Sequence, residues 1–175
     1  MNKLLIVLLV LVIVLYVRYN LRHQEKYEIL QLPSSKLTPD ILAERNPIIV
    51  TDFSDEPRFL IRKAFRYQYT YVKEVMYTAG SDKIIKNYGR YAIISMTSSN
   101  KNTTLNVEVI NPKYKQKNEY QSVLLKVRPS HVLVLPMFWR FKLTIEDSQG
   151  MQTDFKISCL YVHDMFSSMY QSLSM

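Results

Sequence analysis

The sequence predicts a mainly β domain that follows one apolar N-terminal helix. Two observations lead to this fold class: an uninterrupted apolar run near the N-terminus, and a series of short segments of strand composition separated by turn residues. Without the apolar run, the 175-residue chain retains enough length for one core. The sequence therefore divides into a transmembrane signal-anchor at residues 1–22 and one folded α+β domain at residues 23–175.

The N-terminal segment has the composition of a membrane anchor. Lys3 precedes its apolar run and Arg18 follows it, so that charged side chains can reach the headgroups at both ends. The run consists of Leu4, Leu5, Ile6, Val7, Leu8, Leu9, Val10, Leu11, Val12, Ile13, Val14, Leu15, Tyr16 and Val17. A helix of this length covers about 21 Å of a hydrocarbon core of roughly 30 Å, so its flanks must complete the crossing.

A cleavable signal peptide is the competing interpretation of this run. The residues from Val17 to His23 are bulky and charged rather than small, which favours an uncleaved single-pass anchor. More basic residues follow the run than precede it, and the positive-inside rule then predicts that the domain lies on the cytoplasmic side. The lipid bilayer is thus the first expected partner.

The charge balance predicts a second, anionic partner. The chain carries 23 Lys and Arg against 15 Asp and Glu, a net charge of +8. This charge suits lipid headgroups, nucleic acid or an acidic protein face, although a solvated lysine-rich surface produces the same count. Basic and aromatic residues alternate between Phe59 and Tyr67, but an amphipathic core helix needs the same pattern. We therefore expect a protein partner, either a capsid or a membrane protein, and regard nucleic acid as unlikely.

The folded domain begins with short elements of mixed type. Residues 27–32 have strand composition, residues 38–44 have the cap and proline of a short helix, and residues 47–52 form a compact β-branched strand. A second helix starts at residues 54–57 and is expected to cover the open end of a sheet. Residues 66–76 alternate aromatic and polar side chains and fit neither a strand nor a helix well.

The second half of the domain consists of successive strand segments that follow a polar loop at residues 78–89. These segments lie at residues 90–97, 104–110, 120–127, 131–135, 140–145 and 154–162. Short strands separated by turn signals predict a barrel or a sandwich. Asp164 then caps a closing amphipathic helix that carries Met165, Phe166, Met169 and Tyr170.

Two segments resemble the cupin-like domains of the JmjC type. The phrase Leu-Pro-Met-Phe-Trp at residues 135–139 follows a β-branched strand and is similar to the phrase that closes the family's jelly roll, and the strand after Pro47 resembles an early family strand. With its anchor, the chain is similar to the small membrane-anchored cupin-like proteins of large DNA viruses. The resemblance implies a degenerate cupin-like double-stranded β-helix, or jelly roll, with short flanking helices. The residues that carry it are Pro47, Leu135, Pro136, Phe138 and Trp139.

The resemblance also implies where a catalytic site would lie. Catalytic members hold ferrous iron with two His and a carboxylate, and the first two ligands form an H-x-D or H-x-E pair. The histidines His23, His131 and His163 form no such pair, and Arg140 and Phe141 follow the tryptophan, where the last ligand is expected. We therefore interpret the iron site as lost and expect neither a metal nor another cofactor.

The remaining reactive side chains have structural explanations. His131 precedes a strand without a partner at ligand spacing, and Asp164 beside His163 is better explained as a helix cap. Cys159 lies in an apolar strand, where an inert buried thiol is expected. Trp139 and its neighbour Phe138 are expected to fill the interior of the barrel.

The sequence thus predicts a pseudoenzyme rather than an enzyme. Its expected function is that of a non-catalytic, membrane-anchored structural or interaction protein, a viral membrane or minor virion component that links membrane and capsid. Two alternatives stay open: a host-membrane effector, and a remnant Fe(II)/2-oxoglutarate-type oxygenase with displaced ligands.

Overall fold

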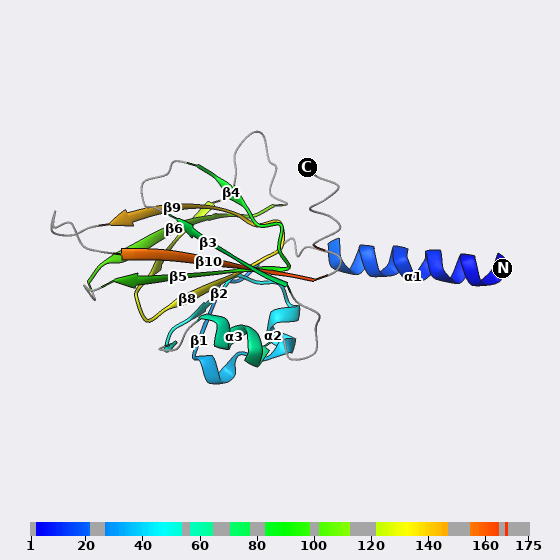
Figure 1. Cartoon of the computed structure of the whole chain (residues 1–175), viewed down its shortest axis with the longest axis horizontal. Helices are drawn as coiled ribbons and strands as arrows, with labels where there is room; N and C mark the ends of the chain where they lie inside the picture. Colours follow the sequence, from blue (N-terminus) through cyan, green and yellow to red (C-terminus); the bar gives the residue numbers. More distant parts are fainter. Residues whose placement is uncertain are drawn as a thin grey trace.

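The protein is a two-sheet β sandwich with a projecting N-terminal helix (Figure 1). The computed structural model describes residues 3–21, 27–53, 57–64, 71–77, 83–98, 102–112, 122–146, 155–164 and 167. Within these ranges most residues lie in strands, and the helices are few, as the sequence predicts.

The two sheets have six and four strands. The larger sheet has the order β1-β2-β8-β5-β10-β3 and the smaller sheet the order β4-β9-β6-β7. The larger sheet consists of β1 (Leu30–Leu32), β2 (Ile48–Val50), β3 (Tyr71–Tyr77), β5 (Tyr91–Ser98), β8 (Val132–Pro136) and β10 (Phe155–His163). The smaller sheet consists of β4 (Ile85–Lys86), β6 (Thr104–Ile110), β7 (Ser122–Val127) and β9 (Arg140–Glu146). Only the pairing of β1 with β2 is parallel among the described strands.

The strand pairing is that of a jelly roll. From β3 onward the pairs are nested, because β3 pairs with β10, β4 with β9, β5 with β8, and β6 with β7. The chain therefore behaves as one long antiparallel hairpin that is rolled into two sheets, which is how a jelly roll removes most of its open edges. β1 and β2 extend the larger sheet beyond β8.

The main core lies between the two sheets. Alternate residues of each strand point inward, as the two-residue period of a strand requires. The fully buried members include Ile94, Leu105, Leu133, Phe141 and Ile157.

A second core covers the outer face of the larger sheet. The strands β2 and β8 are buried on both faces, so this outer face needs an apolar cover. The cover is supplied by α2 (Pro39–Ala43) and α3 (Pro57–Ala64), through Leu42 and Leu60 (Figure 1). We expected α3 to cover the open end of a sheet, but it lies on a sheet face instead.

Most predicted elements are present at the predicted places. Thr38 caps α2 by accepting a hydrogen bond from the Ile41 N–H at 3.4 Å. The ambiguous segment at residues 66–76 contains all of β3 except its last residue, Tyr77, and the predicted polar loop contains the two-residue strand β4. A 3-10 turn, η1 (Ser34–Lys36), separates β1 from α2. Of the predicted closing helix, Met165, Phe166, Met169 and Tyr170 lie outside the described residues.

The helix α1 (Lys3–Leu21) extends away from the sandwich (Figure 1). Its apolar side chains from Leu4 to Leu15 are 42% to 80% exposed, whereas the side chains of Tyr16 and Val17 lie outside the described part. The sequence predicts a membrane span here, but none of the helices in the described residues is long and apolar enough to cross a membrane.

Candidate functional site

The motif residues lie together at one turn of the sandwich and are buried. Leu135 and Pro136 end β8, and Phe138 and Trp139 form the turn into β9. Trp139 is 3% exposed and fills the core between the sheets, as predicted. Its ring meets the ring of Tyr27 edge-on, with 4.8 Å between the ring centroids. Pro47 is also buried and precedes β2, the neighbour of β8.

Asn87, which the sequence analysis did not single out, holds this turn in place. Its side-chain amide donates hydrogen bonds to the carbonyls of Leu135 at 3.1 Å and Pro136 at 2.9 Å. Its Oδ1 accepts a hydrogen bond from the Gly89 N–H at 2.9 Å. Its backbone exchanges two further hydrogen bonds, with the Trp139 carbonyl and the Phe138 N–H, both at 2.8 Å. An asparagine in a polar loop gives no sequence signal of this role.

Gly89 lies in an equally crowded place beside Asn87. A Cβ atom at this position would lie 3.0 Å from the Val162 carbonyl oxygen and 3.1 Å from that of Tyr91. Backbone atoms of β-strands cannot move aside cheaply, so the close approach requires glycine. Asn87 and Gly89 together fix the path of the chain from β4 into β5.

A cavity of about 200 Å³ opens between β3, β4 and β10, next to this chain path. It is lined by Lys73, Val75, Tyr77, Ile85, Lys86, Tyr88, Gly89, Tyr161 and His163. We call it the β3–β4–β10 cavity. It is the candidate site, because it gathers titratable side chains from strands that are distant in the sequence.

Two lysines give the cavity a positive charge. Lys73 on β3 lies opposite Tyr161 on β10 in the strand register. The Lys86 Nζ lies 4.9 Å from the ring centroid of Tyr88 and 5.5 Å from that of Phe138, within cation–π range. Among the described residues that line the cavity, none is acidic.

The cavity also contains a pair of tyrosine hydroxyls. The hydroxyls of Tyr77 and Tyr161 lie 2.7 Å apart and share one hydrogen bond. Burial raises the pKa of both phenols, so both stay protonated near neutral pH. Only one of the two hydroxyl protons is used in their mutual hydrogen bond, and the Tyr161 hydroxyl also contacts the Cys159 thiol. When Tyr161 donates to Tyr77, the proton left for a ligand is that of Tyr77.

His163 is the third polar element of the cavity. The residue is 4% exposed, and its buried Nδ1 has no hydrogen-bond partner among the described residues. Burial lowers the pKa of this imidazole, and the charge of Lys73 adds to the effect, whereas the Asp164 carboxylate opposes it. The ring is therefore neutral near pH 7, with one nitrogen that donates and one that accepts.

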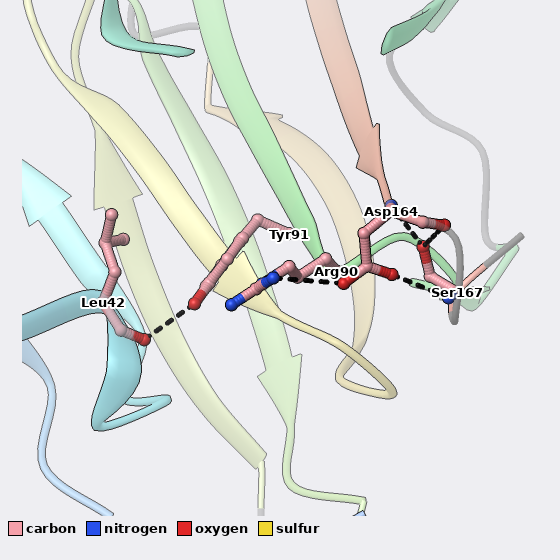
Figure 2. A network of polar contacts seen from close by, with 5 residues as sticks. All are labelled: Leu42, Arg90, Tyr91, Asp164 and Ser167. Carbon is pink, nitrogen blue, oxygen red and sulfur yellow. Dashed lines mark hydrogen bonds and ion pairs between the residues drawn. The ribbon is translucent and has the colours of Figure 1, made fainter. Parts of the chain in front are cut away.

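The neighbouring Asp164 has a structural role in the network of Figure 2. Its Oδ1 accepts a hydrogen bond from the Ser167 N–H at 2.8 Å, and the Ser167 Oγ accepts one from the Asp164 N–H at 2.8 Å. Its Oδ2 lies 3.1 Å from the Arg90 Nη1, and the Tyr91 hydroxyl donates to the Leu42 carbonyl at 2.8 Å (Figure 2). These reciprocal bonds three residues apart are of the kind that a helix cap makes, whereas most of the helix that Asp164 is predicted to cap lies outside the described residues.

The other reactive residues are placed as structural groups. Cys159 is fully buried, and burial raises its pKa to about 12, so the thiol is inert at neutral pH, as predicted. His131 lies in the turn before β8, where its backbone N–H donates a hydrogen bond to the Arg128 carbonyl at 2.8 Å. Burial, assisted by the charge of Arg128, lowers the pKa of His131.

The residues at the implied iron site do not fit a metal. Phe141 is fully buried in the core and pairs with Ile85 across β9 and β4, and Arg140 pairs with Lys86. An apolar core side chain and two cations cannot bind a ferrous ion. Within the described residues, no group of three His, Cys, Asp or Glu side chains could hold a metal ion.

Comparison with known proteins yields no relative from which a function could be transferred. No family model matches the sequence, and no curated protein matches it. Solved structures that resemble the chain include RmlC from Streptococcus suis, in complex with dTDP-D-xylose, at 6% identity and a TM-score of 0.35. That match covers 63% of this chain and 54% of RmlC, so the chain spans about half the length of that protein.

Two further solved structures show the same weak likeness. The Yersinia pseudotuberculosis-derived mitogen matches at 13% identity and a TM-score of 0.34, over 55% of this chain and 88% of the mitogen. Hydroxypropylphosphonic acid epoxidase from S. wedmorenis matches at 13% identity and a TM-score of 0.28, over 53% of this chain and 41% of the epoxidase. Likenesses this weak support neither a fold nor a function for this chain. The jelly roll described above follows from the nested strand pairing alone.

Proposed function

We propose that this protein is a non-catalytic interaction domain that is attached to a membrane by α1. The observation that carries the proposal is the exposure of α1. Twelve consecutive apolar side chains, from Leu4 to Leu15, are more than 40% exposed, and this run covers more than three turns, so every side of the helix is apolar. A helix that is apolar all round is stable only inside apolar surroundings, such as a bilayer.

The short apolar run can still be matched to a bilayer. A helix shorter than the hydrocarbon core is accommodated when the bilayer thins locally or when flanking side chains extend to the headgroups. Lys3 and Arg18 flank the run and have side chains of the right kind. The excess of basic residues after the run supports a position of the jelly roll on the cytoplasmic side.

We also propose that the jelly roll is a degenerate cupin-like domain of the JmjC type. The motif residues support this assignment, because they form the end of β8 and the turn that leads from β8 in the larger sheet to β9 in the smaller sheet. These residues are Leu135, Pro136, Phe138 and Trp139. The apolar Phe141 at the implied ligand position supports a non-catalytic role. The proposed partner is a capsid or membrane protein, and the proposed context is a viral membrane.

Membrane attachment is tested by extraction of the full chain at alkaline pH. The double variant Leu8→Lys and Val12→Lys places two charges one turn apart in α1, and we expect the protein to move from the membrane pellet to the supernatant. The control variant, Leu124→Lys with Ile84→Lys, makes the same change in charge on exposed apolar residues of the sandwich. Retention of the α1 variant in the pellet would overturn the proposal.

The proposed context is tested on purified, protease-shaved particles from the source. Mass spectrometry should recover the chain in the detergent-extracted membrane layer, and crosslinks should join its exposed lysines to a capsid or membrane protein. Absence from particles would exclude a virion component and favour the host-membrane effector.

A further inference from the structure

We propose that the β3–β4–β10 cavity binds a small ligand that carries a phosphate or carboxylate group. The inference does not depend on membrane attachment, because every residue that it uses belongs to the jelly roll. Three independent features of the cavity lead to it: its charge, an unpaired buried imidazole nitrogen, and its hydroxyl donors.

The first feature is the charge of Lys73 and Lys86. Elsewhere on the domain two arginines contact carboxylates: Arg58 contacts Glu74 at 2.7 Å, and Arg90 contacts Asp164 at 3.1 Å. The described residues of the cavity lining instead include two lysines and no acid. Lys73 is exposed at the mouth of the cavity and Lys86 is half-buried, so an anion between them meets two positive charges, and the partly enclosed Lys86 side attracts it more strongly because a low dielectric strengthens the interaction.

The second feature is the Nδ1 of His163, which is buried without a partner among the described residues. Buried polar atoms in folded proteins almost always have a hydrogen-bond partner, and an exception is explained by an ordered water, an ion or another bound group. Two other buried side-chain atoms, His131 Nδ1 and Asn106 Oδ1, also lack a hydrogen bond among the described residues, but only His163 lines this cavity. The neutral imidazole can donate to an anionic oxygen when the proton is on Nδ1. His163 is among the residues that line the cavity, so its ring lies beside a ligand bound there.

The third feature is the hydroxyl pair of Tyr77 and Tyr161. One of the two hydroxyls has a proton that their shared hydrogen bond does not use. Charge-assisted hydrogen bonds from such donors to an anionic oxygen are about twice as strong as neutral ones. Ammonium, imidazole and hydroxyl donors thus surround one space and recognise one chemical class.

The size of the cavity limits the ligand. A volume of about 200 Å³ lies below the roughly 300–1,000 Å³ of pockets for drug-sized molecules, so it accommodates one anionic group with a short organic body. A soluble metabolite and the headgroup of a phospholipid both satisfy this description.

The position of the cavity makes a headgroup reachable if α1 is inserted. Leu21 ends α1, and the chain to Tyr27 spans at most about 21 Å. Tyr27 packs on Trp139, and the ring of the adjacent Phe138 lies 5.5 Å from the Lys86 Nζ. The proposal that a lipid headgroup supplies the anion rests on the proposed membrane attachment. The proposal that the cavity binds an anion does not.

The first experiment is a calorimetric titration of the full chain, in nonionic detergent, with inorganic phosphate. We expect saturable binding that weakens about tenfold or more in the double variant Lys73→Gln with Lys86→Gln. The control, Lys36→Gln with Lys156→Gln, removes the same charge from exposed positions and should bind as the wild type does. No saturable binding, or equal losses in both double variants, would overturn the proposal.

The second experiment locates the anion without a change of charge. In the full chain with ¹⁵N-labelled histidine, phosphate should shift the ring nitrogens of His163 and leave those of His131 in place. The variant Tyr77→Phe keeps the ring and removes one hydroxyl, and it should bind phosphate several-fold more weakly while it stays folded, with a melting temperature lower by only a few degrees. A shift confined to His131 would contradict the assignment.

The last experiment identifies the source. The full chain is placed in lipid nanodiscs of phosphatidylcholine alone or with added phosphatidic acid, and phosphate is titrated again. If the acidic headgroup occupies the cavity, phosphate should bind more weakly in the acidic discs than in the neutral ones. This difference between the two kinds of disc should disappear in the Lys73 and Lys86 double variant, and that result supports a headgroup ligand. Equal binding in both discs supports a soluble ligand. Failure of membrane attachment would leave the detergent titration unchanged, so the two proposals fail separately.

Discussion

Replacement of Asn87 by alanine tests whether this residue holds the jelly roll together. Asn87 is fully buried, and its side chain makes three hydrogen bonds, to the carbonyls of Leu135 and Pro136 and from the Gly89 N–H. The substitution leaves one buried N–H and two buried carbonyls without this partner. A stranded buried donor costs about 1–3 kcal/mol, and a carbonyl that loses one of its partners costs less.

These contributions predict a loss of about 3–4 kcal/mol in the free energy of unfolding. A domain of this size loses about 2–4 °C in melting temperature per kcal/mol, so the melting temperature should fall by about 10 °C. The chain has a single tryptophan, Trp139, which is 3% exposed and accepts a hydrogen bond from the Asn87 N–H at its carbonyl. Its emission during urea unfolding therefore reports on this region directly.

Two further variants separate hydrogen bonding from volume. Asn87→Asp keeps the size and the Oδ1 acceptor but places a carboxylate oxygen against two carbonyls, so it should destabilise at least as much as alanine. Asn102→Ala changes an exposed asparagine and should cost less than about 0.5 kcal/mol. A loss below about 1 kcal/mol for Asn87→Ala, or near-wild-type stability for Asn87→Asp, would refute the reasoning.

Three other predictions follow from buried groups. Gly89→Ala should lower the free energy of unfolding by about 1–3 kcal/mol in urea titrations, because its Cβ would lie 3.0 Å from the Val162 carbonyl oxygen. Cys159, with its pKa raised to about 12, should resist iodoacetamide at pH 8 until urea unfolds the chain; rapid native labelling would contradict its burial. Burial lowers the pKa of His131 and His163 below 6.5, so the unfolded state binds more protons and the urea midpoint should fall from pH 7 to 5. Replacement of both histidines by glutamine should flatten this slope.

The fold could be predicted from the sequence where side-chain pattern alone determines the structure. β6 lies at residues 104–110, as predicted, because its apolar and polar residues alternate between the core and the solvent. β3 remained ambiguous because, as an edge strand, it carries aromatic or charged residues on both faces. β4 could not be predicted, because two residues are too few to show a period and only their pairing with β9 makes them a strand.

The candidate site could not be predicted, because its residues meet only through the nested pairing. Tyr77 and Tyr161 share a hydrogen bond although they lie 84 positions apart in the sequence. Nothing in either local sequence indicates the other, and Asn87 has the same local signature as any loop asparagine. By contrast, the buried Trp139 and the inert Cys159 were predictable, because local apolar surroundings determine both outcomes.

The position of β10 between β5 and the edge strand β3 sets the order of events during synthesis. β10 separates β5 from β3 in the larger sheet, yet it follows both of them in the chain. The sheet therefore cannot close until β10 has left the ribosome, long after α1 has emerged. We expect α1 to enter a bilayer while the jelly roll is still unfolded. A chain that stalls before β10 would be a membrane-held segment whose β3 and β5 are open to pairing with other chains.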